Sequence, residues 1–233
     1  MFGIGGALLA TPLLKVGLGL PALLSLATPL PAAIPAAISG TIGYARARLV
    51  RYDVAWRTLI FAMPMNIGGA YLTKAIPGSV LMVATGIVLI YSAWTFLRLG
   101  LKKSDETPED VREEPPGLLL YASGALAGFM SGFLAIGGGI VMVPAFVKVL
   151  RLPVKQAVAT SLLCVAALAI PGVIVHTTLG HIDWNVALIL CASVIPMSYL
   201  GARLATSLKN TTLERIYGTV MLVFAIYFII KNI

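Results

Sequence analysis

The stretch Ala-Ile-Gly-Gly-Gly-Ile-Val-Met-Val-Pro, residues 135–144, decides how the chain folds, because it places three glycines and a proline inside a long apolar run. The run begins at Gly117 and continues to Leu150. Glycine weakens a helix, and in a membrane the backbone groups that it frees find no water. Unwound backbone at membrane depth is tolerated mainly where it is buried in protein or lines a cavity. We therefore expect a buried break at 136–139.

The composition places the chain in a membrane. Of its 233 residues, 59% are hydrophobic and 11% are charged, and the mean hydropathy is +0.96. An average soluble domain has about 25% charged residues. Apolar runs of about 20 residues recur along the chain, so we predict an all-α polytopic membrane protein in contact with lipid. The net charge of +8 then bears on orientation, and no nucleic-acid partner is expected.

The chain repeats itself with an offset of 132 residues. Residues 3–100 align without a gap with residues 135–232, and 26 of these 98 pairs are identical. Internal duplication of this kind is the usual build of a secondary transporter. The counterpart of 117–134 would precede Met1, so the first repeat is expected to lack its opening helix; we favour a truncated start over the loss of one wall. The matched positions include Gly5-Gly6 with Gly137-Gly138, Pro12 with Pro144, Thr28 with Thr160, and Gly40 with Gly172.

The repeats define three parts of the chain. Residues 1–98 form the first membrane repeat, 99–116 a charged, proline-bearing linker, and 117–233 the second membrane repeat. In the first repeat we predict helices at 7–18, 22–44, 54–73 and 78–98. In the second we predict helices at 117–134, 140–150, 156–176, 184–205 and 212–230. Residues 140–150 rise only about 16 Å as a helix, which suits a re-entrant half-helix.

The basic residues favour a hairpin at 117–150. If this stretch crossed the membrane once, the 17 basic residues would divide 8 to 9; if it turns back at the glycines, they divide 14 to 3. The second division is what the positive-inside rule expects. It gives each repeat an odd number of crossings and so predicts two inverted repeats, each a glycine-broken hairpin followed by three helices. The linker would be cytoplasmic and the C-terminus external, and Gly124, Gly128 and Gly132 would serve close helix packing.

The glycine breaks are the predicted substrate site. The first N–H groups of a helix have no partner within it and attract anions, and discontinuous helices commonly build transporter sites at the bilayer midplane. We expect Gly5, Gly6, Gly137, Gly138 and Gly139 to bind an anion, or else only to permit a turn. Hydroxyl groups of Thr28, Thr160 and Ser161 would assist, or would bond the preceding helical turn. Weaker candidates are Asn66, Ser198 and His176.

Signatures of other chemistry are scarce. The chain has no HExxH, GxSxG, P-loop or CxxC motif, so we predict no enzyme, no catalytic residue, no cofactor and no metal site. Cys164 and Cys191 are expected to be unpaired, buried residues. His176 and His181 lie in a short loop, predicted external, where they would sense protons or cap helices. Asp183 is a predicted N-cap.

These residues resemble a known family. Residues 127–144, Ala-Gly-Phe-Met-Ser-Gly-Phe-Leu-Ala-Ile-Gly-Gly-Gly-Ile-Val-Met-Val-Pro, are similar to the hallmark of the TauE/SafE sulfite-exporter family. Residues 152–161 and the later His176, Gly180 and Asp183-Trp184 resemble its second-repeat pattern. The resemblance implies a bacterial or archaeal inner-membrane permease for sulfite, sulfonates or related small organic anions. The chain departs from the pattern at its start and in Gly-Gly-Ala (5–7) and Pro29.

The leading hypothesis is a secondary transporter that exports a small oxyanion by alternating access. A passive anion channel is a second hypothesis, which single-channel current would favour and counterflow would oppose. A third is a membrane subunit that anchors a larger complex through the acidic linker. The partners expected are a small anion and lipid, and a homo-oligomer is compatible with the sequence.

Overall fold

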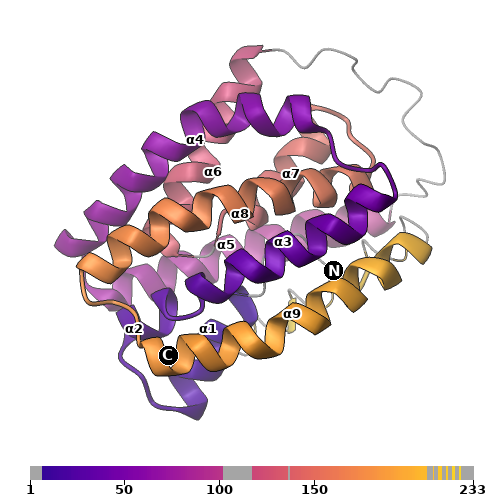
Figure 1. Cartoon of the computed structure of the whole chain (residues 1–233). Coiled ribbons are helices and arrows are strands. Elements are labelled where there is room, and N and C mark those ends of the chain that lie inside the picture. Colours follow the sequence, from indigo (N-terminus) through magenta and orange to yellow (C-terminus); the bar gives the residue numbers. More distant parts are fainter. Residues whose placement is uncertain are drawn as a thin grey trace.

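The computed structural model describes residues 7–101, 117–135 and 137–208, with isolated positions between 212 and 226. Within these ranges the chain is helical apart from short connections, which confirms the predicted all-α fold (Figure 1). The first repeat contains α1 (Ala7–Gly17), α2 (Ala22–Ala27), α3 (Leu30–Arg46), α4 (Tyr52–Leu72), the 3-10 turn η1 (Thr73–Ala75) and α5 (Gly78–Leu101). The second contains α6 (Gly117–Leu134), α7 (Gly139–Val149), α8 (Val154–Thr178) and α9 (Trp184–Ser207).

The predicted helix at 22–44 is divided in the structure. α2 ends at Ala27 and α3 begins at Leu30, with Thr28 and Pro29 between them. Pro29 and Pro31 have no N–H group, so a continuous helix would lack two backbone hydrogen bonds here. In α8 the counterpart of Pro29 is Ser161, and that helix runs unbroken. Thr28 and Pro29 keep right-handed helical backbone angles, so residues 22–46 still form one candidate membrane span, with a turn at the prolines that was not predicted. The predicted helix at 212–230 and most of the linker lie outside the described residues.

The equivalent helices α3 and α8 pack against each other and run in opposite directions (Figure 1). A Cβ atom on Gly40 of α3 would lie 3.1 Å from the Leu162 side chain of α8. A Cβ atom on Gly172 of α8 would lie 3.0 Å from the Leu30 side chain of α3. Gly40 and Gly172 are equivalent under the 132-residue offset, and so are Leu30 and Leu162. The same contact therefore occurs twice, once from each repeat.

The repeats are also joined by two equivalent hydrogen bonds. The Asp183 N–H donates to Thr28 Oγ1, and the Arg51 N–H donates to Thr160 Oγ1, each over 3.0 Å. These four residues form two pairs related by the offset of 132. In keeping with these bonds, α3 lies beside α9 of the other repeat, and α8 lies beside α4. A two-fold relation between similar units produces contacts of this kind, in which each unit makes the same contact to the other.

Glycine allows α6 to approach α4 closely. Gly124, Gly128 and Gly132 face the backbones of Thr58, Ala62 and Asn66 in turn, so the two helices run parallel. A Cβ atom on Gly124 would lie 2.7 Å from the Thr58 carbonyl oxygen, and one on Gly128 or Gly132 would overlap a backbone carbonyl. The predicted role of these glycines in helix packing is confirmed.

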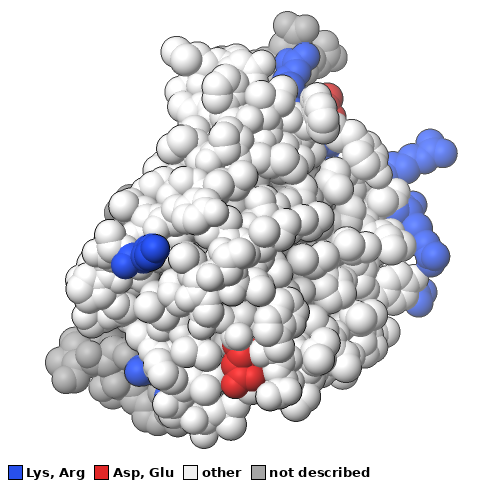
Figure 2. Space-filling model, turned by 60° about the vertical axis from the view of Figure 1, so that its left-hand side comes forward, with Lys and Arg blue, Asp and Glu red and all other residues white. Residues whose placement is uncertain are grey.

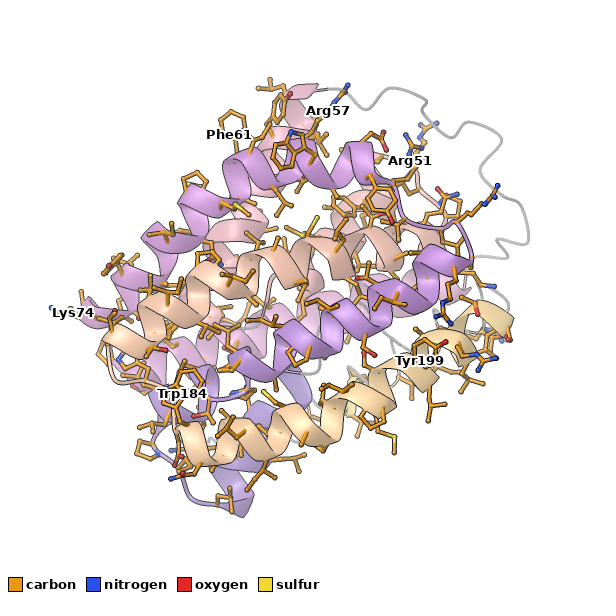
Figure 3. All side chains as sticks on the ribbon, in the orientation of Figure 1. Arg51, Arg57, Phe61, Lys74, Trp184 and Tyr199 are labelled. Carbon is orange, nitrogen blue, oxygen red and sulfur yellow. The ribbon has the colours of Figure 1, made fainter. Side chains whose placement is uncertain are left out.

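α6 and α7 form the predicted hairpin. α6 begins level with the start of α4, and α7 leads through residues 150–153 into α8, whose Thr160 bonds Arg51 just before α4. The hairpin therefore starts and ends at one end of the bundle, which we call the basic end. Basic side chains gather here and leave the face between the ends almost uncharged (Figure 2). By the bounds of their helices, they include Arg46, Arg48, Arg51, Arg57, Lys148, Arg151, Lys155 and Arg203, whereas Lys15 is near the other end of its repeat. Figure 3 labels Arg51 and Arg57 at the basic end and Lys74 at the opposite end.

Several helices are suited to cross a membrane. Residues 22–46, 117–134, 154–178 and 184–207 are long and apolar enough to do so. Exposed aromatic side chains mark both ends: Tyr52 and Trp56 at the basic end, and Tyr71 and Trp184 at the other. Aromatic residues concentrate at the two membrane interfaces. Tyr52 and Tyr71 lie about 28 Å apart along α4, close to the thickness of a bilayer's hydrocarbon core. The chain is a multi-pass membrane protein.

Candidate functional site

The chain reverses direction between α6 and α7 through left-handed backbone. The φ angles of Ala135, Gly137 and Gly138 are 52°, 79° and 74°. Gly138 is the N-cap of α7, and a Cβ atom there would lie 3.0 Å from Ser131 Cβ and 3.1 Å from the Ala127 carbonyl oxygen. Glycine is required at 138 both by its backbone conformation and by the lack of space. The predicted break is present, and α7 begins at Gly139.

The N-terminus of α7 is buried near the middle of the bundle. Gly138 lies beside Ala127 and Ser131, and Gly128 of the same turn packs on Ala62, midway along α4. The first hydrogen bonds inside α7 run from the N–H groups of residues 141 and 142 to the Gly138 carbonyl, over 3.1 and 3.0 Å. The N–H groups of residues 139 and 140 precede these bonds. A helix start of this kind offers free donors and the positive end of the helix dipole.

Two buried polar atoms border this helix start. Ser131 Oγ and Asn66 Oδ1 have no hydrogen-bond partner among the described residues, and each side chain is only 1% exposed. A Cβ atom on Gly138 would lie 3.4 Å from Ser131 Oγ, so the hydroxyl adjoins the N-cap. Asn66 packs on Gly132, the residue after Ser131, and faces Gly172 of α8. Because buried polar atoms are almost always paired, these two mark a place where a ligand or water fits.

In the described part of the chain, both carboxylates have partners other than the start of α7. Asp53 pairs with Arg51 over 2.8 Å at the basic end. Asp183 Oδ1 accepts the N–H groups of Asn185 and Val186 over 3.0 and 3.3 Å, which confirms its predicted role as the N-cap of α9. The described residues contain no cluster of His, Cys, Asp or Glu that could hold a metal ion. A helix start whose surroundings hold no carboxylate partner among the described residues suits an anion.

The predicted hydroxyl residues lie elsewhere. Thr28 and Thr160 both accept backbone N–H groups of the other repeat, at opposite ends of the bundle. Ser161 Oγ donates to the Val158 carbonyl of its own helix over 2.9 Å. The structure therefore does not bring these three residues together at the glycine break. Their observed contacts join the repeats and close a helical turn.

The weaker candidates divide between two places. Asn66 lies at the site, and His176 reaches it indirectly, because its Nε2 atom is 3.0 Å from the Gly132 carbonyl oxygen. Ser198 Oγ instead donates to the Ala36 carbonyl in the contact between α9 and α3. Gly5 and Gly6 lie outside the described residues. Cys164 is an unpaired, buried residue as predicted, whereas Cys191 is unpaired but only partly buried.

Ser131 is the residue that sequence reasoning missed. It lies in the arm that also carries Gly124, Gly128 and Gly132, seven residues before Gly138. A hydroxyl two helical turns ahead of a break can lie next to that break when the chain folds back on itself. That signal was available once the hairpin had been inferred.

A multi-pass helical protein with a half-helix that starts inside the bundle is built like a membrane transporter. Comparison with known families agrees: residues 1–228 match the model of the family described as sulfite exporter TauE/SafE. The chain belongs to this family, as its resemblance in sequence predicted.

Curated relatives are similar along most of their length. A "Probable membrane transporter protein" of Xylella fastidiosa is 28% identical, with 100% of this chain and 90% of the relative aligned. The "Probable membrane transporter protein YunE" of Bacillus subtilis is 27% identical over 84% of this chain and 77% of its own length. A relative from Methanocaldococcus jannaschii with a name of the same kind is 24% identical over 99% of this chain. No solved structure matches the chain significantly.

Proposed function

We propose that this transporter moves a small oxyanion, such as sulfite or an organosulfonate, outward across the cytoplasmic membrane. The observation that carries the proposal is the buried start of α7 beside Ser131 and Asn66. Bare N–H groups and a hydroxyl can donate to an oxyanion, and the helix dipole favours its charge. The carboxylates of the described residues, which would repel an anion, are engaged elsewhere: Asp53 pairs with Arg51, and Asp183 caps α9. The family name, sulfite exporter, supports the same class of substrate.

Alternating access between two inverted repeats is the proposed mechanism. The reciprocal bonds of Thr28 and Thr160, and the opposite directions of α3 and α8, support a two-fold axis across the helices. Such an axis in the membrane plane would invert one repeat relative to the other. In this proposal the basic end faces the cytoplasm, as the positive-inside rule requires. Gly5 and Gly6 would open the matching half-helix α1 on the other side of the site.

Counterflow in liposomes tests the proposal. The full chain is reconstituted, loaded with unlabelled sulfite, methanesulfonate or sulfate, and exposed to a trace of the labelled anion. A transporter gives a transient accumulation of label, whereas a passive channel gives electrical current and no such overshoot. If none of these anions shows saturable exchange, the proposal is overturned.

Two serine variants on α6 test whether anion transport depends on the start of α7. Ser131→Ala removes a hydroxyl that adjoins the α7 N-cap, so we expect the apparent affinity for the anion to fall about tenfold. Ser123→Ala is the control, because Ser123 Oγ donates to the Leu120 carbonyl of its own helix over 2.8 Å. Equal effects of both substitutions would argue against an anion at Ser131.

A further inference from the structure

The turn after α8 holds two histidines against each other. The His181 N–H donates to the His176 carbonyl over 2.9 Å, and the Gly180 N–H donates to the Thr177 carbonyl over 3.0 Å. With Gly180 at a φ of 70°, these bonds form a Schellman motif. This motif brings together the side chains at its first and last positions. Here both are imidazoles, with their Nδ1 atoms 3.3 Å apart.

The hydrogen bonds fix which ring nitrogens carry protons. His176 Nε2 is 3.0 Å from the Gly132 carbonyl oxygen, which can only accept, so Nε2 carries a hydrogen. In the neutral ring His176 Nδ1 is then an acceptor, and His181 Nδ1 must be the donor to it. His181 Nε2 is left as the open acceptor. A directed chain of hydrogen bonds thus runs from His181 through His176 to Gly132, the residue after Ser131.

Of the two rings, His181 is the one that protons from outside the bundle can reach. His176 is only 2% exposed, whereas His181 is half-buried and lies in the loop before α9. Burial lowers the pKa of His181, so the ring is neutral near pH 7 until a proton is supplied. The charged groups on neighbouring elements at this end are Asp183, which caps α9, and Lys15 and Lys74. Among the described residues none of these charged groups contacts either ring.

We propose that the two imidazoles are a proton relay that links proton uptake at the end of α8 to anion binding at the start of α7. The link rests on the proposed function. A proton adds to His181 Nε2, and the Nδ1 proton of His181 passes to His176 Nδ1. His181 is left neutral, with its hydrogen on Nε2, and His176 becomes the imidazolium. One proton is bound and its charge arrives beside Gly132.

A positive charge at His176 favours an anion next to Ser131, and a bound anion favours protonation by the same factor, since linkage is reciprocal. The relay therefore makes anion affinity depend on the pH at this end of the bundle. No step of the proposed relay needs a carboxylate, so proton uptake and anion binding would be linked through the two imidazoles alone.

Binding measurements on the purified chain test the relay. We expect methanesulfonate, whose sulfonate group stays ionised throughout, to bind about tenfold more tightly at about pH 5.5 than at about pH 7.5. His181→Asn keeps an amide donor in place of Nδ1–H but cannot be protonated. It should abolish this pH dependence while the Kd at pH 7.5 changes less than about twofold. Thr178→Val, on an exposed residue of the same helix end, should leave the pH dependence intact.

NMR of isotope-labelled histidine supplies a readout that needs no anion. The chain has two histidines, so the wild type and His181→Asn assign both rings. We expect His176 as the Nε2–H tautomer and a coupled titration of the two rings; independent titration would overturn the relay. Binding without pH dependence would also overturn the relay alone. Failure of methanesulfonate, sulfite and sulfate to bind at any pH would overturn the proposed function and, with it, the link to the relay.

Discussion

Thr28 Oγ1 accepts the backbone N–H of Asp183 over 3.0 Å, across a sequence separation of 155 residues. Its counterpart Thr160 accepts the N–H of Arg51 over the same distance. Each hydroxyl satisfies an N–H group of the loop that precedes a long helix of the other repeat. The two repeats are therefore held in register by the same bond used twice, at opposite ends of the bundle.

These threonines should be needed for stability. Thr28→Val or Thr160→Val leaves a partly buried N–H without its acceptor, so we expect each to lower the free energy of unfolding by about 1–3 kcal/mol. Thr→Ser at either position should restore most of the loss. Thermal unfolding in detergent measures the effect, with Thr178→Val on the exposed end of α8 as the control. Equal stability of all three valine variants would contradict the role of the two bonds.

Two adjacent glycines on α4 should differ in how their replacement by alanine changes the stability of the protein. A Cβ atom on Gly69 would meet the Phe129 carbonyl and the Phe133 N–H of α6, whereas one on Gly68 meets nothing within 4 Å. Gly69→Ala should lower stability by about 2 kcal/mol through overpacking. Gly68→Ala should be neutral or stabilise by up to about 1 kcal/mol, because alanine is the better helix former. Similar losses for both would show that α4 and α6 are not in close contact.

In the turns after α3 and α8, gaining and losing a glycine should change stability in opposite directions. Gly180 has a φ of 70° with open space around its Cα, so Gly180→Ala introduces backbone strain of about 1 kcal/mol. Arg48, its counterpart after α3, has a φ of 55°. Arg48→Gly removes the corresponding strain and should be neutral or slightly stabilising. Paired melting curves check both signs, and destabilisation by Arg48→Gly would mean that its side chain makes an essential contact.

The buried position of His181 predicts a pH dependence of stability. Its pKa is lowered by burial, so below its ordinary pKa of about 6.5 the unfolded chain binds more protons than the folded one. Stability should therefore fall as the pH drops from about 7.5 to about 5.5. His181→Asn should reduce this fall, as measured by thermal unfolding at the two pH values. An unchanged slope would assign the dependence to other groups.

Much of the fold follows from local sequence. The glycines at 137–139 set the break, and the predicted start of α7 is within one residue of Gly139. The repeat predicted that Thr28 and Thr160 are equivalent, and they make equivalent bonds. It did not reveal their acceptor role, because their partners are more than 100 residues away in the chain. The sequence identified Pro29 as a departure from the pattern, but not the turn that separates α2 from α3 there.

The candidate site was harder to derive than the fold. Gly137, Gly138 and Gly139 follow from the break itself, but Ser131 becomes their neighbour only when α6 and α7 fold back on each other. Asn66 joins them because Gly132 removes the side chain that would keep α4 away. Such proximity depends on how helices pack, and a pattern within one segment carries no information about it.

The glycine contact between α4 and α6 restricts how the protein can open. α4 of the first repeat packs so closely on α6 of the second that the two helices have no room to slide. α3 of the first repeat is likewise bound to α9 of the second. The helices of the two repeats are thus interleaved, and the repeats cannot separate as two rigid bodies. In the proposed mechanism, access to the site would then come from one crossed pair tilting against the other.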